Sequence, residues 1–110
     1  MRRMIQINEL IQHALAQIFI TDVEVPREFF ITVTKIDCAS NLKTARAFVS
    51  VLPFNKSDEA LKFLINSRHE IQKFLGRRIN LQFTPILRFS IDDTGETADN
   101  IYTTLDKIKE

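Results

Sequence analysis

The stretch FFITVTKIDCASNLKTARAFVSVL, residues 29–52, decides the fold. Its first part, residues 29–37, is rich in β-branched and aromatic side chains, which predicts a strand. Residues 45–52 alternate between an apolar and a more polar face, and Pro53 ends this second strand. The apolar face carries Ala45, Ala47, Val49 and Val51. Because the connection CASNLKT is short and suits a turn, we expect an antiparallel hairpin.

Segments with helical periodicity flank this hairpin on both sides. Residues 3–20 carry apolar side chains three and four positions apart, which predicts an amphipathic helix. Residues 57–75 repeat that pattern, with Ser57 as the expected N-cap. The weaker helix formers among residues 66–69 predict a kink or break. Gly76 follows Leu75 directly, where we expect a left-handed C-terminal cap.

From Ile79 onward, the apolar side chains are spaced two residues apart, as in a strand. Apolar side chains at odd positions predict a long strand over residues 79–91, with Pro85 at an edge or a bulge. Residues 97–110 return to helical spacing and predict a short final helix. The expected order is therefore α–β–β–α–(kink)–α–β–α, an α+β fold with helices on one face of a three-stranded sheet. We expect one domain over residues 1–110, with an ordered core of about residues 3–92 and an acidic C-terminal segment, 93–110.

The charge of the chain is segregated along the sequence. The 110 residues include 15 Lys and Arg and 14 Asp and Glu, for a formal charge of +1. Residues 62–91 carry six basic side chains and one Glu, a net +5, whereas residues 92–110 carry two Lys and six acidic side chains, a net −4. The basic stretch is either a solvated face balanced by the acidic end or a phosphate-binding surface.

The residues that could carry chemistry are few. Cys38 is the single cysteine, which excludes an internal disulfide and predicts a reducing, cytoplasmic environment. Two glycines are too few for a phosphate-binding loop, and two histidines are too few for a metal constellation. No run reaches the roughly 18 apolar residues of a membrane span. We therefore expect no enzyme activity, no cofactor, no metal and no membrane partner.

Several strings resemble a known family in their shared order along nearly the whole chain. Residues 71–76, IQKFLG, resemble the family string Ile-Arg-x-x-Leu-Gly, and residues 85–92, PILRFSID, resemble Pro-x-Leu-x-Phe-x-x-Asp. Residues 39–45, ASNLKTA, are similar to Ser-x-Asp-Leu-x-x-Ala, and residues 47–50, AFVS, to Val-Tyr-Val-Ser. The family that these strings resemble is ribosome-binding factor A, a bacterial small-subunit maturation protein.

The resemblance implies a type II KH-like fold with the order α–β–β–α–α–β. In this family an Ala-x-Gly kink replaces the Gly-x-x-Gly loop with which ordinary KH domains clamp RNA. The kink position in this chain is Ser67-Arg68-His69, so that His69 replaces the family glycine. Gln72 replaces the family arginine that follows it.

The resemblance also implies a function without catalysis. The family binds the immature small (30S) ribosomal subunit and assists late processing and maturation of 16S rRNA near its 5′-terminal helix, notably in the cold. It then leaves, in some systems with the help of a GTPase. For this chain we therefore expect the small subunit and its 16S rRNA as partners, and a monomeric protein.

The basic side chains supply the candidate RNA ligands. The first group lies within eleven residues and comprises Arg68, Lys73, Arg77 and Arg78. Lesser candidates are Lys35, Lys43, Arg46 and Arg88. Phosphate contacts by such residues release counterions and make affinity depend steeply on salt. The alternative is a small α+β interaction domain that self-associates without binding RNA.

Overall fold

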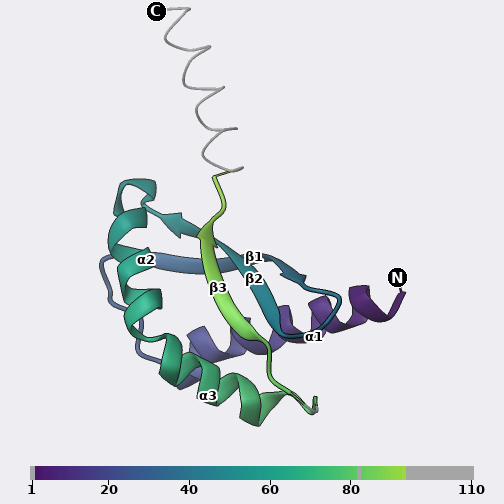
Figure 1. Cartoon of the computed structure of the whole chain (residues 1–110). Helices are drawn as coiled ribbons and strands as arrows, with labels where there is room; N and C mark the ends of the chain where they lie inside the picture. The colour runs from purple at the N-terminus through teal and green to yellow at the C-terminus, as the bar shows by residue number, and fades with distance from the viewer. Residues whose placement is uncertain (1, 82, 94–110) are drawn as a thin grey trace, which may run out of the picture.

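The computed structural model of the protein describes residues 2–81 and 83–93 (Figure 1). Its elements are α1 (Arg2–Gln17), the π-helical turn η1 (Ile18–Asp22), β1 (Phe30–Cys38), β2 (Thr44–Leu52), the 3-10 turn η2 (Phe54–Lys56), α2 (Ser57–Asn66), α3 (Arg68–Arg78) and β3 (Ile86–Ile91). This order confirms the α+β class and the predicted α–β–β–α–(kink)–α–β arrangement. The predicted helix within residues 97–110 lies outside the described residues.

The three strands form one mixed sheet in the order β1-β2-β3. β1 and β2 make the predicted antiparallel hairpin, whose register runs from Phe30 opposite Leu52 to Cys38 opposite Ala45, with an irregularity between Val33 and Lys35. β3 instead runs parallel to β2, which requires a crossover connection. The helices α2 and α3 provide that crossover, as Figure 1 shows.

The core lies between one face of this sheet and the helices. The predicted apolar face of β2 is confirmed, because Ala45, Ala47, Val49 and Val51 are all buried. One cluster of buried side chains contains Ala45, Ala47 and Val49. The same cluster includes Ile11 of α1, Leu64 of α2 and Ile71 of α3. Side chains alternate across a strand, so residues next to these core positions point to the opposite face. No described helix contributes to that second face.

The predicted break between the second and third helices is present. α2 ends at Asn66, and Ser67 leaves the helical conformation with φ −94° and ψ 1° before α3 begins at Arg68. The Ser67 amide donates to the Phe63 carbonyl at 2.9 Å, while the Ser67 carbonyl accepts from the Ile71 amide at 2.9 Å. The backbone of the break is therefore hydrogen-bonded into both helices, which fixes their junction.

The predicted caps of these helices are wrong. Gly76 has no positive φ and lies inside α3, which continues to Arg78. A Cβ at Gly76 would lie 3.3 Å from the Thr84 hydroxyl oxygen, so glycine serves close packing here and not a left-handed turn. Ser57 is a helical residue that follows the turn η2, and its hydroxyl donates to the Phe54 carbonyl at 2.6 Å.

The predicted long strand over residues 79–91 is also only partly correct. β3 begins at Ile86, where pairing with Thr44 starts, and the described residues from 79 to 85 are irregular. Pro85 has no backbone N–H to offer a neighbouring strand. The period-two pattern fails at Phe83, whose side chain is 72% exposed. The same pattern holds at Leu87, which is fully buried.

Candidate nucleic-acid interface

The outer face of α3 carries an exposed basic surface. Ile71 and Leu75 are fully buried and hold the inner face of this helix against the core. Lys73 and Arg77 are exposed and four residues apart, which places them as neighbours on the outer face. The Arg77 guanidinium lies 5.7 Å from the centre of the Phe74 ring, so its side chain is ordered along the helix.

Arg68 is the first residue of α3 and lies on another side of the helix from Arg77, because the nine positions that separate them make about two and a half turns. Arg68 and His69 of the break are both exposed. We call three exposed cations of α3, Arg68, Lys73 and Arg77, the α3 ridge; Lys73 and Arg77 share the outer face, and Arg68 lies about 13 Å from Arg77 along the helix axis. Within the described residues, no carboxylate oxygen lies within 4 Å of a charged nitrogen of the ridge. The helix itself contributes one exposed acidic side chain, Glu70.

Arg78 has a different environment from the rest of its predicted group. Its Nε lies 2.6 Å from Oδ2 of Asp22, and its Nη2 lies 2.9 Å from Oδ1 and donates to the Thr21 hydroxyl at 2.9 Å. The hydrogen bond from Arg78 lowers the pKa of Asp22, and the same contact raises the pKa of Arg78. Arg78 thus joins α3 to η1, and Asp22 neutralises its charge. We therefore leave Arg78 out of the α3 ridge.

Three of the four lesser candidates lie on the other side of the sheet. Lys35, Arg46 and Arg88 are exposed and occupy the face opposite the core, as their burial patterns show. We call this surface, together with Phe48, the open sheet face. Lys35 lies opposite Phe48 on the neighbouring strand, with its Nζ 5.7 Å from the ring centre. Lys43 is exposed in the β1–β2 connection, where its carbonyl accepts a hydrogen bond from Ile86.

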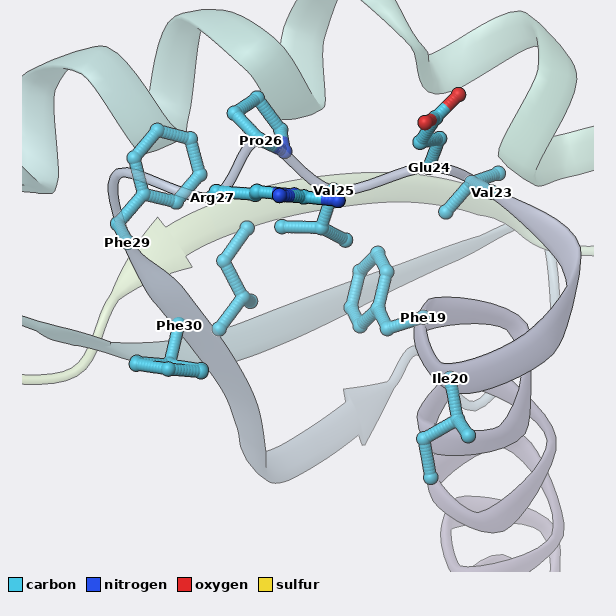
Figure 2. A pocket seen from close by; sticks show the side chains of 10 residues that line it. Phe19, Ile20, Val23, Glu24, Val25, Pro26, Arg27, Phe29 and Phe30 are labelled. Atoms are coloured by element: carbon cyan, nitrogen blue, oxygen red, sulfur yellow. The ribbon is translucent and has the colours of Figure 1, made fainter.

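An apolar pocket lies away from these basic groups. It has a volume of about 670 Å³ and is lined by η1, the connecting segment 23–29 and the start of β1. Figure 2 shows that Phe19, Val25 and Phe29 supply much of its wall. Ile20 and Phe30 of the same lining are 73% and 74% exposed. The sequence carried no signal for this pocket.

The described residues hold little that suits catalysis. Cys38 is buried, and burial, reinforced by the negative charge of Asp37, raises the pKa of its thiol. A buried thiol held in its protonated form is a poor nucleophile. The described part of the chain contains no group of three or more His, Cys, Asp or Glu that could hold a metal ion. Within the same residues, no helix is long and apolar enough to cross a membrane.

Comparison with known proteins adds independent information. The family model described as ribosome-binding factor A matches residues 3–105. The chain is 35% identical to ribosome-binding factor A of Chlamydia pneumoniae over 112 residues, covering 99% of this chain and 93% of that relative. The crystal structure of ribosome-binding factor A from Thermus thermophilus matches with a TM-score of 0.71 and 24% identity, over 80% of this chain and 93% of that one.

A second similar structure shows the Thermus thermophilus factor in a complex. It is a homology model of Thermus thermophilus ribosome binding factor A fitted into a cryo-EM map of a complex between the 30S subunit and that factor. It matches with a TM-score of 0.64 and 24% identity, over 76% of this chain and 88% of that one. At these identities the two structures establish a shared fold.

Proposed function

Since this chain belongs to the ribosome-binding factor A family, we propose that it binds the small ribosomal subunit. The related Thermus factor that shares this fold is described in a complex with the 30S subunit. The observation that carries the proposal to particular residues is the α3 ridge. Its three cations are exposed and lack a carboxylate within 4 Å in the described part of the chain.

We propose that the α3 ridge contacts the 16S rRNA backbone. Arg and Lys bind phosphate oxygens through charge-assisted hydrogen bonds, and Arg does so through two parallel bonds. Like charges four residues apart on a helix repel each other by a few tenths of a kcal/mol, about 0.2–0.5, which a bound phosphate between Lys73 and Arg77 would relieve. The break at Ser67 sets the direction of α3, so it positions the ridge relative to the sheet.

The finer activity that we propose is assistance in late processing and maturation of 16S rRNA near its 5′-terminal helix, including in the cold. We propose that the protein works in the cytoplasm as a single-domain monomer, without catalysis, cofactor or metal, and that a GTPase helps to release it. The family relationship supports these proposals.

The experiment is cosedimentation with purified small subunits at several salt concentrations. The double substitution Lys73→Gln and Arg77→Gln removes two ridge charges, so we expect about tenfold weaker binding and a salt slope reduced by about 2. A matched control, Arg27→Gln with Lys62→Gln, removes two exposed charges outside the ridge and should change binding less than twofold. Unchanged binding by the ridge variant would show that α3 is not the contact surface.

One observation favours the alternative of self-association. Phe30 and Leu52 are opposite each other across β1 and β2, and their side chains are 74% and 64% exposed. Exposed apolar side chains of this size, next to the pocket, are typical of protein interfaces. Sedimentation equilibrium distinguishes the two functions, because a concentration-dependent dimer without affinity for small subunits would support self-association and contradict our proposal.

A further inference from the structure

Two arginines lie side by side on the open sheet face. The parallel register places Arg46 of β2 directly beside Arg88 of β3, on strands about 4.8 Å apart. Both side chains are exposed. Like charges directly opposite each other on neighbouring strands are unfavourable. Within the described residues, neither arginine has a carboxylate oxygen within 4 Å. This pair is therefore suited to an anion held between the two guanidinium groups.

The neighbouring charges on this face leave it positive. Asp37 of β1 lies opposite Arg46 in the register, so the row across the sheet carries one acidic and two basic side chains. Lys35 adds a third positive charge in the next row. The carboxylate of Asp92 lies further along the sheet, near the Thr34 hydroxyl, which donates to it at 2.5 Å. The basic side chains are thus concentrated at the Arg46 end of the face.

An aromatic ring accompanies the arginine pair. Phe48 is two residues from Arg46 on the same face of β2, about 6.6 Å along the strand. Its ring is half-buried, with the Lys35 ammonium on one side and Ser90, a small residue, beside it on β3. Aromatic rings on a sheet, flanked by cations, bind single-stranded RNA by stacking on bases while the cations hold the backbone.

We propose that the open sheet face is a second RNA-binding surface, which takes a single-stranded segment. A base stacks on Phe48, and Arg46 and Arg88 together bind a nearby phosphate. The inference rests on the proposed RNA-binding function but concerns a different surface. The core separates this face from the α3 ridge, because the alternate residues of β2 and the inner face of α3 pack together. The protein could thereby hold two rRNA segments at once.

The test uses fluorescence anisotropy with a labelled 12-nucleotide uridine RNA. The double substitution Arg46→Gln and Arg88→Gln should weaken binding at least tenfold and reduce the salt slope by about 1.4, the value for two charges on a single strand. Phe48→Leu should weaken binding at least fivefold without changing the salt slope. The control pair Arg27→Gln and Lys62→Gln should stay within twofold of the wild type.

A second measurement needs no variant and locates the RNA directly. Amide chemical-shift changes in the 15N-labelled wild-type protein should include Arg46, Phe48 and Arg88 when the uridine RNA is added. Shifts confined to α3, or unchanged binding by the Arg46 and Arg88 variant, would overturn the inference. Equal affinity for a 12-base-pair RNA duplex would also overturn it, because a paired base cannot stack on Phe48.

The same variants separate this inference from the proposed function. If the wild type cosediments with small subunits but the uridine RNA does not bind the open sheet face, the inference alone fails. If the wild type does not bind small subunits, the proposed function fails, whichever surface the uridine RNA contacts. Circular dichroism melting of each variant establishes that the folded proteins are compared.

Discussion

Replacing Gln72 by Leu should destabilise the protein by removing one link between α3 and β3. The Gln72 side-chain amide donates to the Pro85 carbonyl at 2.6 Å, and its oxygen accepts from the Leu87 amide at 3.0 Å. These two bonds satisfy backbone groups on either side of the first residue of β3. Leu is similar in volume to Gln and equally helix-compatible, so the substitution tests the hydrogen bonds and not the packing.

The expected magnitude follows from the burial of the two partners. Pro85 and Leu87 are fully buried, so their backbone groups have little access to water once the amide is gone. A buried polar group without a partner costs about 1–3 kcal/mol, and two are left. Gln72 itself is only half-buried, which lets some water reach the site. We therefore expect a loss of about 2 kcal/mol, near the lower end of the sum.

Urea denaturation followed by circular dichroism measures this loss. A decrease of about 2 kcal/mol corresponds to a midpoint lower by about 1 M, for a slope of about 2 kcal/mol per M. Gln6 is exposed on α1, so Gln6→Leu is the matched control and should stay within about 0.5 kcal/mol of the wild type. A loss below about 0.5 kcal/mol for Gln72→Leu would refute the role that we assign to the two hydrogen bonds.

Three further predictions concern α3 and its contacts. Gly76→Ala should stabilise the protein by about 0.5 kcal/mol in urea titrations, because helix propensity outweighs a small shift of Thr84; a loss of stability would contradict this. Leu75→Ala should cost about 2–5 kcal/mol in the same titrations, since Leu75 is fully buried; a smaller loss would show that the core closes around the cavity. The lowered pKa of Asp22 means that its ion pair with Arg78 stabilises the fold above about pH 4 and is lost as the pH falls. Asp22→Asn should therefore melt below the wild type at pH 7 and converge with it in acid; an equal difference at every pH would exclude this linkage.

The hairpin was predictable because its signals are local. The alternation of Ala45, Ala47, Val49 and Val51 belongs to one strand, and the turn that joins it to β1 lies beside it in the sequence. The break at Ser67 was equally predictable, because residues 66–69 have a low helix propensity. Such patterns depend on residues that are close together in the sequence, and the contacts among those residues determine the hairpin and the break.

The errors arose where distant residues decide the structure. Gly76 resembles a helix cap in the sequence, but its small size instead accommodates Thr84. The strand pattern begins at Ile79, but β2 supplies a partner only from Ile86 onward, where pairing with Thr44 starts. Likewise, Arg78 resembles its neighbour Arg77 until Asp22, far away in the chain, neutralises it. No spacing rule within a single segment reveals these contacts.

The candidate site was predicted as a set of residues but not as an arrangement. From the sequence, Lys35, Arg46 and Arg88 were lesser candidates than the residues of α3, because they are scattered along the chain. The sheet register brings Arg46 and Arg88 together, and this register depends on β3 running parallel to β2. An antiparallel or shifted third strand would have placed a different residue beside Arg46.

The parallel pairing of β2 and β3 also bears on how the chain folds. The hairpin can close early because its strands adjoin in sequence, whereas β3 must wait for α2 and α3 to be made and to dock. On a ribosome that synthesises this chain from its N-terminus, residues 30–52 emerge well before Arg88. We therefore expect the arginine pair to form only once β3 has docked on β2, so that a nascent or partly folded chain exposes Arg46 without its neighbour.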